Sequence, residues 1–321
     1  MKVAFFGSPH FALSVLEQLN QDHEVALVVS QPDKRAGRGM KVTSPAVIEK
    51  ARTLGLPVRQ PERLKGNDAF AEELAKLELD VAITAAYGKI LPASLLPIPK
   101  HGFLNVHASL LPKYRGAAPI QWALIHGETE TGITIMQTAQ GMDTGDIRHV
   151  KRVSIHDEDD AQRLFDKLAL LGATALAEAL DLLAEGKLPR TPQDKTQATH
   201  APMLTREDGQ INWQTSARDI FNRHRGVSMW PKSWTLFQDK TLKVPVLELL
   251  SEKSLSADVV NVDVDVATSG GTVLDVHADG IDVAANPGVI RLVNVQPSGK
   301  AAMEARAFAN GYGVKAGVCF D

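Results

Sequence analysis

The chain of 321 residues has a single cysteine, few aromatic side chains and a small net charge. Cys319 alone excludes an intramolecular disulfide and a thiolate metal cluster, and it is typical of a protein of the reducing cytoplasm. A formal net charge of −3 excludes a uniformly basic nucleic-acid binder, although it is compatible with a local basic patch. The hydrophobic content of 44% is enough for a sizeable core, and the length favours two domains.

Long uninterrupted apolar runs are missing as well. The apolar stretch at the amino terminus is interrupted at Ser8 and Pro9, too early for a signal peptide. The longest apolar-rich stretch, 168–183, contains two carboxylates and has the spacing of an amphipathic helix rather than of a membrane span. We therefore expect a cytoplasmic protein that does not enter a membrane, and we expect it to act as a monomer.

Strand-like and helix-like segments alternate in the first part of the chain. Apolar strand-like runs are expected at 2–7, 24–30, 80–86, 102–108 and 132–138, and a long helix near 160–185. This alternation predicts an α/β domain, residues 1–187, with a Rossmann-like, mainly parallel sheet. Residues 188–206 are rich in Pro, Thr, Gln and Lys without periodicity, so we expect a linker. Short strands separated by turn signals then predict a small OB-like β-barrel domain over residues 207–321.

Polar side chains stand at the end of the predicted strand 102–108. Asn105 and His107 share one face, because side chains alternate along a strand. Burying them without partners would cost on the order of 1–3 kcal/mol each, so a ligand site at the carboxyl end of the sheet is favoured. Asp143 lies in a glycine-flanked loop after the strand 132–138 and can reach the same edge. An amide, an imidazole and a carboxylate suit acyl transfer to an amine, because they stabilise an oxyanion and move protons.

Spacing alone leaves other interpretations open. His107 can be a satisfied core histidine, and Asp143 can be the cap of a loop. A metal site on these two residues would lack further well-spaced ligands, so we expect no metal. A dehydrogenase is disfavoured, because the first strand is followed by 7–10, Gly-Ser-Pro-His, which lacks the glycine fingerprint for a dinucleotide.

A basic segment follows the second predicted strand. Its four cations are interleaved with glycines: Lys34, Arg35, Arg38 and Lys41. A flexible positive loop of this kind suits a phosphate backbone or the end of a tRNA acceptor stem. An ordinary solvated loop is the alternative.

Several contiguous motifs resemble the 10-formyltetrahydrofolate-dependent formyltransferases. Asn105-Val106-His107, followed at once by Ser109-Leu110-Leu111-Pro112, is similar to the signature of that family. Further stretches resemble the members of the family that act on an aminoacylated tRNA. They are 6–12, 31–33, 37–39, 113–120, 130–136 and 141–146. The similarity extends along essentially the whole chain and is strongest over residues 1–150.

The resemblance implies that a formyl group moves from 10-formyltetrahydrofolate, the co-substrate, to the α-amine of methionyl initiator tRNA. It implies that Asn105, His107 and Asp143 are the catalytic residues. It also implies two sets of binding residues, which are Ser109, Leu110, Leu111, Pro112, Tyr87 and Gly88 for the folate and Lys34, Arg35, Arg38 and Lys41 for the tRNA. The domain 207–321 is implied to contact tRNA, although it carries slightly more acidic than basic residues. Met203 stands where a lysine is common in the family, so we expect one contact to be missing or replaced.

Two alternatives keep the same first-domain motifs. A formyltransferase that acts on a nucleotide or sugar amine would not require the basic segment or the second domain. A non-catalytic protein that binds folate or RNA predicts the loss of a catalytic residue, and all three are present.

Overall fold

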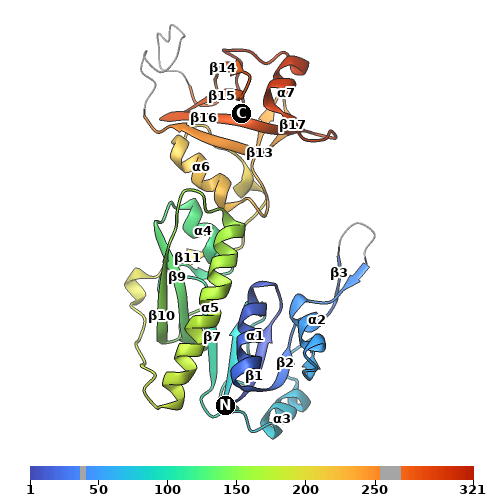
Figure 1. Cartoon of the computed structure of the whole chain (residues 1–321), viewed down its shortest axis with the longest axis vertical. Coiled ribbons are helices and arrows are strands. Elements are labelled where there is room, and N and C mark those ends of the chain that lie inside the picture. The colour runs from blue at the N-terminus through green and yellow to red at the C-terminus, as the bar shows by residue number, and fades with distance from the viewer. Residues whose placement is uncertain (37–40, 254–268) are drawn as a thin grey trace. The chain divides into compact units, whose positions relative to one another are not determined.

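The structure is a computed structural model that describes residues 1–36, 41–253 and 269–321. Its contacts divide the chain into two compact units. The first unit comprises residues 1–119, 129–155 and 163–202, and the second comprises residues 120–128, 156–162 and 203–321. Each unit is built around a sheet of its own (Figure 1).

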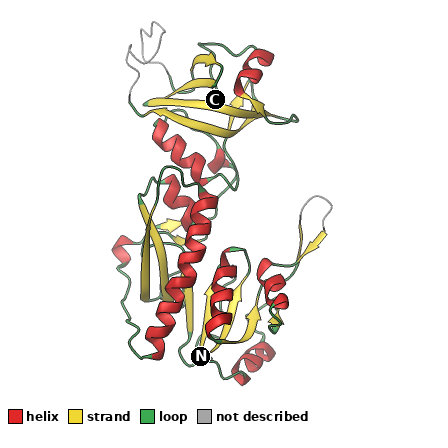
Figure 2. Ribbon diagram, viewed as in Figure 1, coloured by secondary structure: helices red, strands yellow, loops and turns green. Residues whose placement is uncertain are grey.

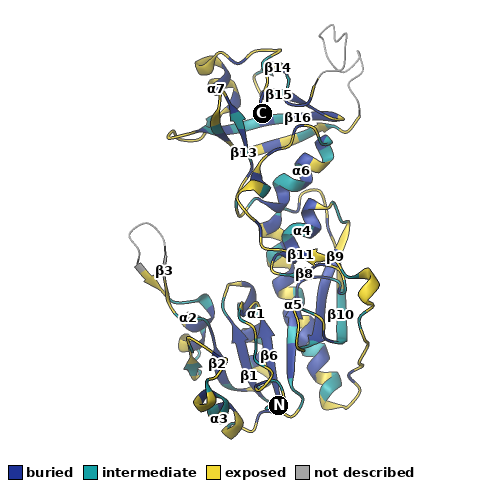
Figure 3. Ribbon diagram, turned by 180° about the vertical axis from the view of Figure 1, so that it is seen from behind, coloured by how far each residue is buried: buried dark blue, intermediate teal, exposed yellow. Residues whose placement is uncertain are grey.

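A seven-stranded sheet forms the centre of the first unit, in the order β10-β9-β7-β6-β1-β2-β5. The strands are β1 (Lys2–Gly7), β2 (Glu24–Val29), β5 (Val58–Arg59), β6 (Val81–Ala85), β7 (Phe103–His107), β9 (Glu130–Gln137) and β10 (Ile147–Ser154). The five strands from β5 to β7 are parallel, whereas β9 is antiparallel to β7 and β10 to β9. Figure 3 shows the central strands as buried, which explains why they are nearly continuous apolar runs.

Helices cover this sheet (Figure 2). They are α1 (Phe11–Asp22), α2 (Ala46–Thr53), α3 (Asp68–Lys76) and α5 (Ala161–Ala184). Helix α5 lies close to β7, because a Cβ added at Gly172 would be only 3.0 Å from Cγ1 of Val106. None of the helices in the described ranges has both the length and the apolar composition needed to cross a membrane.

The second unit is an antiparallel β-structure with strand order β12-β13-β16-β15-β14, and β17 pairs with β16. Its strands are β12 (Trp234–Phe237), β13 (Lys240–Ser251), β14 (Val273–His277), β15 (Gly280–Ala285), β16 (Gly288–Pro297) and β17 (Met303–Glu304). Its helices are α6 (Ala217–Gly226), α7 (Ala305–Tyr312) and all but the first residue of α4 (Pro119–Ile125). Gln238 and Asp239 have φ of 50° and 61°, the left-handed pair that a two-residue hairpin between β12 and β13 requires.

The carboxyl terminus joins the two edges of this second sheet. The N–H of Val273, in β14, donates to the carbonyl of Val318 at 2.8 Å. Leu236, in β12, exchanges backbone hydrogen bonds of 2.8 and 3.1 Å with Asp321. Residues 318–321 therefore close the sheet between its outer strands, as a small barrel requires. The predicted fold class, a mainly parallel α/β sheet followed by a small β-domain, is confirmed.

Candidate active site

The candidate site lies at the carboxyl end of β7, in the first unit. Asn105 and His107 share one face of this strand, and the register pairs Asn105 with Thr84 of β6 and His107 with Thr134 of β9. Thr84 donates a hydrogen bond from Oγ1 to Oδ1 of Asn105 at 2.7 Å. The amide nitrogen of Asn105 then points away from Thr84, and the described residues offer it no acceptor. A pair of N–H donors therefore remains available at the strand end.

His107 is held in place by a backbone carbonyl. Its side chain is buried, and Nε2 lies 2.9 Å from the carbonyl oxygen of Tyr114. A carbonyl only accepts hydrogen bonds, so Nε2 carries a proton and Nδ1 is the nitrogen at which a proton can be gained or lost. Nδ1 faces Oδ2 of Asp143 at 3.8 Å. This distance suits an ion pair or a bridging water rather than a direct hydrogen bond.

Asp143 is presented by a left-handed turn, with φ of 51°. Its Oδ2 accepts a hydrogen bond from the N–H of Gly116 at 2.9 Å, so the same oxygen is fixed from one side and faces His107 on the other. The side chain is largely shielded from solvent, with 16% of its area exposed. In the described part of the chain, no group of three or more His, Cys, Asp or Glu side chains is arranged to hold a metal ion.

The structure thus brings together the three residues predicted to be catalytic. An amide donor, an imidazole with one free nitrogen and a carboxylate converge where β7 ends. Such a set can stabilise a developing oxyanion and relay a proton, which are the two requirements of acyl transfer to an amine.

The predicted folate segment, Ser109–Pro112, forms a tight turn directly after β7. The hydroxyl of Ser109 is buried and donates to the carbonyl of Lys113 at 2.7 Å. The Oγ1 of Thr134 donates to the carbonyl of Ser109 at 2.7 Å and accepts from the N–H of Leu111 at 3.1 Å. The hydroxyl of Ser109 therefore shapes the turn, while Leu110 and Pro112 are the partly exposed members of the segment.

Tyr87 and Gly88 follow β6 at the same sheet edge. The ring of Tyr87 packs edge-on against Phe6, with centroids 5.5 Å apart, and burial raises the pKa of its hydroxyl to about 12. The carbonyl of Tyr87 already accepts hydrogen bonds from Ser8 and Gln31 at 3.3 and 2.9 Å. Gly88 has φ of 74°, and a Cβ there would lie 2.4 Å from the side chain of Gln31. The side chain of Tyr87 belongs to the core, so a folate contact at this loop would involve its backbone.

The basic segment begins as a hairpin. β3 (Lys34–Ala36) pairs with β4 (Lys41–Thr43) in an antiparallel register. Nζ of Lys34 donates to Oε1 of Gln31 at 2.8 Å. Arg38, predicted to contact tRNA, lies outside the described residues.

The sequence reasoning missed the contribution of residues 188–202, which it assigned to the linker. These residues belong to the first unit, and β11 (His200–Ala201) pairs with β8 (Arg115–Gly116). Oγ1 of Thr199 accepts from the N–H of Tyr114 at 2.8 Å, next to the carbonyl that holds His107. Gln193 donates to the carbonyl of Asp143 at 2.9 Å. The segment has no apolar periodicity, so no sequence signal marked it as ordered.

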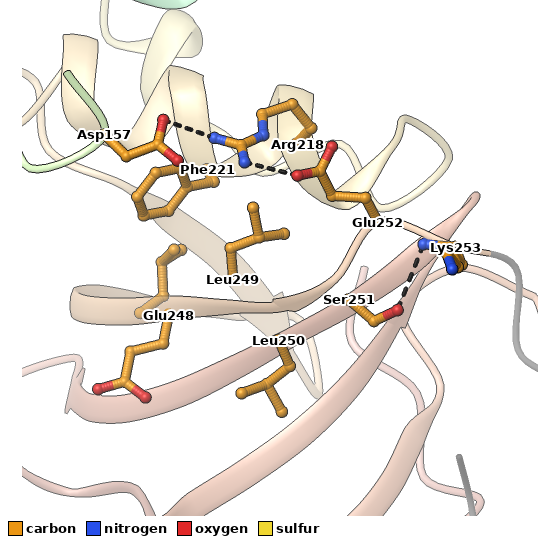
Figure 4. A pocket seen from close by; sticks show the side chains of 10 residues that line it. Asp157, Arg218, Phe221, Glu248, Leu249, Leu250, Ser251, Glu252 and Lys253 are labelled. Carbon is orange, nitrogen blue, oxygen red and sulfur yellow. Dashed lines mark hydrogen bonds and ion pairs between the residues drawn. The ribbon is translucent and has the colours of Figure 1, made fainter. Parts of the chain in front are cut away.

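A separate hollow in the second unit contains none of the predicted site residues (Figure 4). Arg218 on its wall is paired with Asp157 at 2.8 Å and with Glu252 at 2.5 Å. One guanidinium thus engages two of the three carboxylates that line the hollow, and the third is Glu248.

Comparison with known proteins defines the class. The family model "Formyl transferase" matches residues 1–180, and "Formyl transferase, C-terminal domain" matches residues 203–313. The chain belongs to the formyl transferase family. It is 48% identical over 320 residues to the methionyl-tRNA formyltransferase of Deinococcus radiodurans, covering 100% of this chain and 96% of the relative. It is 42% identical to the methionyl-tRNA formyltransferase of Staphylococcus aureus strain MW2, with 97% and 96% covered.

Solved structures show the same fold in more distant proteins. The N-formyltransferase of Helicobacter canadensis, in complex with folinic acid and dTDP-3-aminofucose, gives a TM-score of 0.68 at 17% identity, covering 92% of this chain and 99% of that one. The sugar 3N-formyl transferase WlaRD gives 0.66 at 16% identity, covering 94% and 99%.

Proposed function

We propose that this protein transfers the formyl group of 10-formyltetrahydrofolate to the α-amine of methionyl initiator tRNA, which yields N-formylmethionyl-tRNA for translation initiation. The observation that carries the proposal is the convergence of Asn105, His107 and Asp143 at the end of β7. Its support is the similarity to methionyl-tRNA formyltransferases along the whole chain. The folate is supported by the family and by the solved structures of two more distant formyltransferases, determined with 5-N-formyl-THF and with folinic acid.

The reaction forms one C–N bond and breaks another. The neutral α-amine attacks the formyl carbon, and the formyl oxygen becomes an oxyanion. The amide N–H group of Asn105 and the protonated ring of His107 stabilise this charge, each donor contributing roughly 10²–10³ in rate. A free α-amino group has a pKa of about 7.7–8.0, so a useful neutral fraction is present near neutral pH.

Collapse of the intermediate requires a proton on N10, the leaving nitrogen of the folate. Nδ1 of His107 is suited to deliver it, because Nε2 is held by the carbonyl of Tyr114. Asp143 faces Nδ1 and stabilises the charged ring, and the pair accepts the proton released by the attacking amine. Proton relay of this kind contributes about 10²–10⁴ in rate. No step uses a metal, so we expect formyl transfer to continue in the presence of a chelator.

Both partners have proposed contact regions. We assign residues 1–187 to the catalytic domain, with the folate against Ser109–Pro112 and the backbone of Tyr87 and Gly88. We assign tRNA contacts to Lys34, Arg35, Arg38 and Lys41, and to the domain 207–321. Residues 188–206 connect the two domains in sequence, and their first part, 188–202, is ordered as part of the first unit. We further propose that the protein works in the cytoplasm as a monomer.

A competition among acceptors tests the proposal. The purified protein is given 10-formyltetrahydrofolate with methionyl initiator tRNA, free methionine or an amino sugar nucleotide, and formylated product is measured. We expect turnover on the tRNA alone. Turnover on the amino sugar nucleotide without turnover on the tRNA would refute the proposed acceptor, and no formyl transfer to any of them would refute the proposed activity.

A further inference from the structure

Gln193 uses one end of its carboxamide to bond to the loop that carries Asp143 and the other end to bond to Arg115. Its Nε2 donates to the carbonyl of Asp143 at 2.9 Å and to the carbonyl of Gly145 at 2.6 Å. Its Oε1 accepts from Nε and Nη2 of Arg115 at 3.0 and 2.7 Å. One side chain from the 188–202 segment therefore makes four hydrogen bonds to two other segments.

These two segments are the ones that orient the carboxylate of Asp143. Arg115 precedes Gly116, whose N–H donates to Oδ2 of Asp143. Gln193 thus bonds to the backbone of Asp143 with one end of its carboxamide. With the other end it bonds to Arg115, the neighbour of Gly116, whose N–H donates to the carboxylate of Asp143. The left-handed conformation of Asp143 is uncommon for a residue with a Cβ, although aspartate adopts it more readily than most, and the contacts of Gln193 help to hold it.

The buried guanidinium of Arg115 fixes the orientation of the Gln193 carboxamide. Arg115 is 8% exposed, and a buried cation requires acceptors. The described hydrogen bonds of its guanidinium both go to Oε1 of Gln193. A charge-assisted contact of this kind fixes the amide orientation, which leaves Nε2 directed at the two carbonyls.

We propose that Gln193 is a positioning residue for formyl transfer, which holds Asp143 so that its carboxylate faces Nδ1 of His107. This inference rests on the proposed function, and it adds a residue to the three proposed catalytic residues Asn105, His107 and Asp143. Gln193 has no hydrogen bond to Asn105 or His107 among the described residues, so the proposed effect on the reaction passes through Asp143.

Gln193→Glu separates positioning from general structural support. The glutamate keeps an acceptor for Arg115, with added charge, but it cannot donate to the carbonyls of Asp143 and Gly145. Gln193→Ala is the second variant, since it removes both contacts without adding charge. Gln197→Glu is the matched control, because Gln197 lies in the same segment, is exposed, and its side chain bonds to Asp194 at 3.0 Å and to no other described residue.

Each variant is assayed with methionyl initiator tRNA and 10-formyltetrahydrofolate, with the melting temperature as a check on folding. We expect Gln193→Glu to lower kcat by about 10–100-fold, the effect of a small displacement of a reacting group. KM for both substrates should stay within about threefold, because no substrate contact is removed. Gln197→Glu should match the wild type.

A double-variant cycle with Asp143→Asn decides the mechanism. If Gln193 acts through Asp143, adding Gln193→Glu or Gln193→Ala to Asp143→Asn should lower kcat by no more than about twofold further. Full multiplication of the two losses, a change confined to KM, or an equal loss in Gln197→Glu would overturn the proposal. If the wild type formylates only another amine, the proposed acceptor fails, and the same cycle on that amine still tests Gln193.

Discussion

Asp143→Asn isolates the charge of the carboxylate from its place in the loop. The asparagine oxygen can still accept the N–H of Gly116, so the turn should persist. What disappears is the negative charge 3.8 Å from Nδ1 of His107. This charge matters when the ring is protonated, as the proposed reaction requires.

The distance gives the size of the expected loss. Two unit charges 3.8 Å apart attract each other by about 1 kcal/mol in a water-like medium and by about 4 kcal/mol at an effective dielectric constant near 20. Both side chains are largely shielded from solvent, so the value should lie between these limits. A rate loss of roughly tenfold to 10³-fold follows. The free energy of unfolding should change by no more than about 1 kcal/mol, the contribution of a single hydrogen bond, since the substitution keeps the hydrogen bond from Gly116.

Single-turnover formylation of methionyl initiator tRNA measures this loss without a contribution from product release. Asp146→Asn is the matched control, because Asp146 is in the same loop but pairs with Arg190 instead of facing His107. We expect this control to stay within a few-fold of the wild type. An Asp143→Asn rate within twofold of the wild type would refute the role given to the carboxylate, and so would an equal loss in both variants.

Three further outcomes are expected. Arg38→Ala should raise KM for tRNA and leave folate affinity unchanged in steady-state assays; equal effects on both would contradict the tRNA assignment. Gly116→Ala places a methyl group 2.5 Å from the carbonyl of Ala201 at φ of 126°, so melting temperature and kcat should both fall, with a stability loss of about 2 kcal/mol or more. Burial lowers the pKa of His224 to about 4 from 6.5, so the unfolded chain binds a proton between these values that the folded chain does not. The contribution of His224 to the free energy of unfolding is therefore fully present above pH 6.5 and is lost as the pH falls toward 4. His224→Asn should reduce this loss by about 1–3 kcal/mol, measured by urea unfolding at a series of pH values. An unchanged pH dependence in the variant would exclude His224 as its origin.

The central strands and the positions of Asn105 and His107 could be predicted because they depend on local pattern. A buried parallel strand is a short apolar run, and the two-residue period puts both side chains on one face. Asp143 required the further assumption that its loop returns to the same edge. The pairing of β9 with β7 does not provide this return, because Gln137 at the end of β9 lies opposite Leu104 near the start of β7. The loop has to fold back before Asp143 can face His107.

The start of α1 shows where local pattern fails. Ser8 and Pro9 form a good capping pair, yet the helix begins at Phe11 and has no side-chain cap. The hydroxyl of Ser8 donates instead to the carbonyl of Tyr87, in the loop after β6 and far away in sequence. Tertiary hydrogen bonds of this kind override a local preference worth about 1 kcal/mol.

The 188–202 segment explains the larger miss. Low apolar content and Pro, Thr and Gln residues are typical of a linker, because such a segment cannot bury enough surface to order itself. A segment that fixes the backbone of a catalytic loop needs the same composition, however, since amides and hydroxyls are the side chains that bond to peptide groups. Gln193 bonds in this way to the peptide carbonyl of Asp143, and Thr199 bonds to the peptide N–H of Tyr114. Composition therefore predicts only that the segment has no core of its own. Whether it is ordered depends on peptide groups elsewhere in the fold with which it can bond, and the loops around Asp143 and Tyr114 supply them.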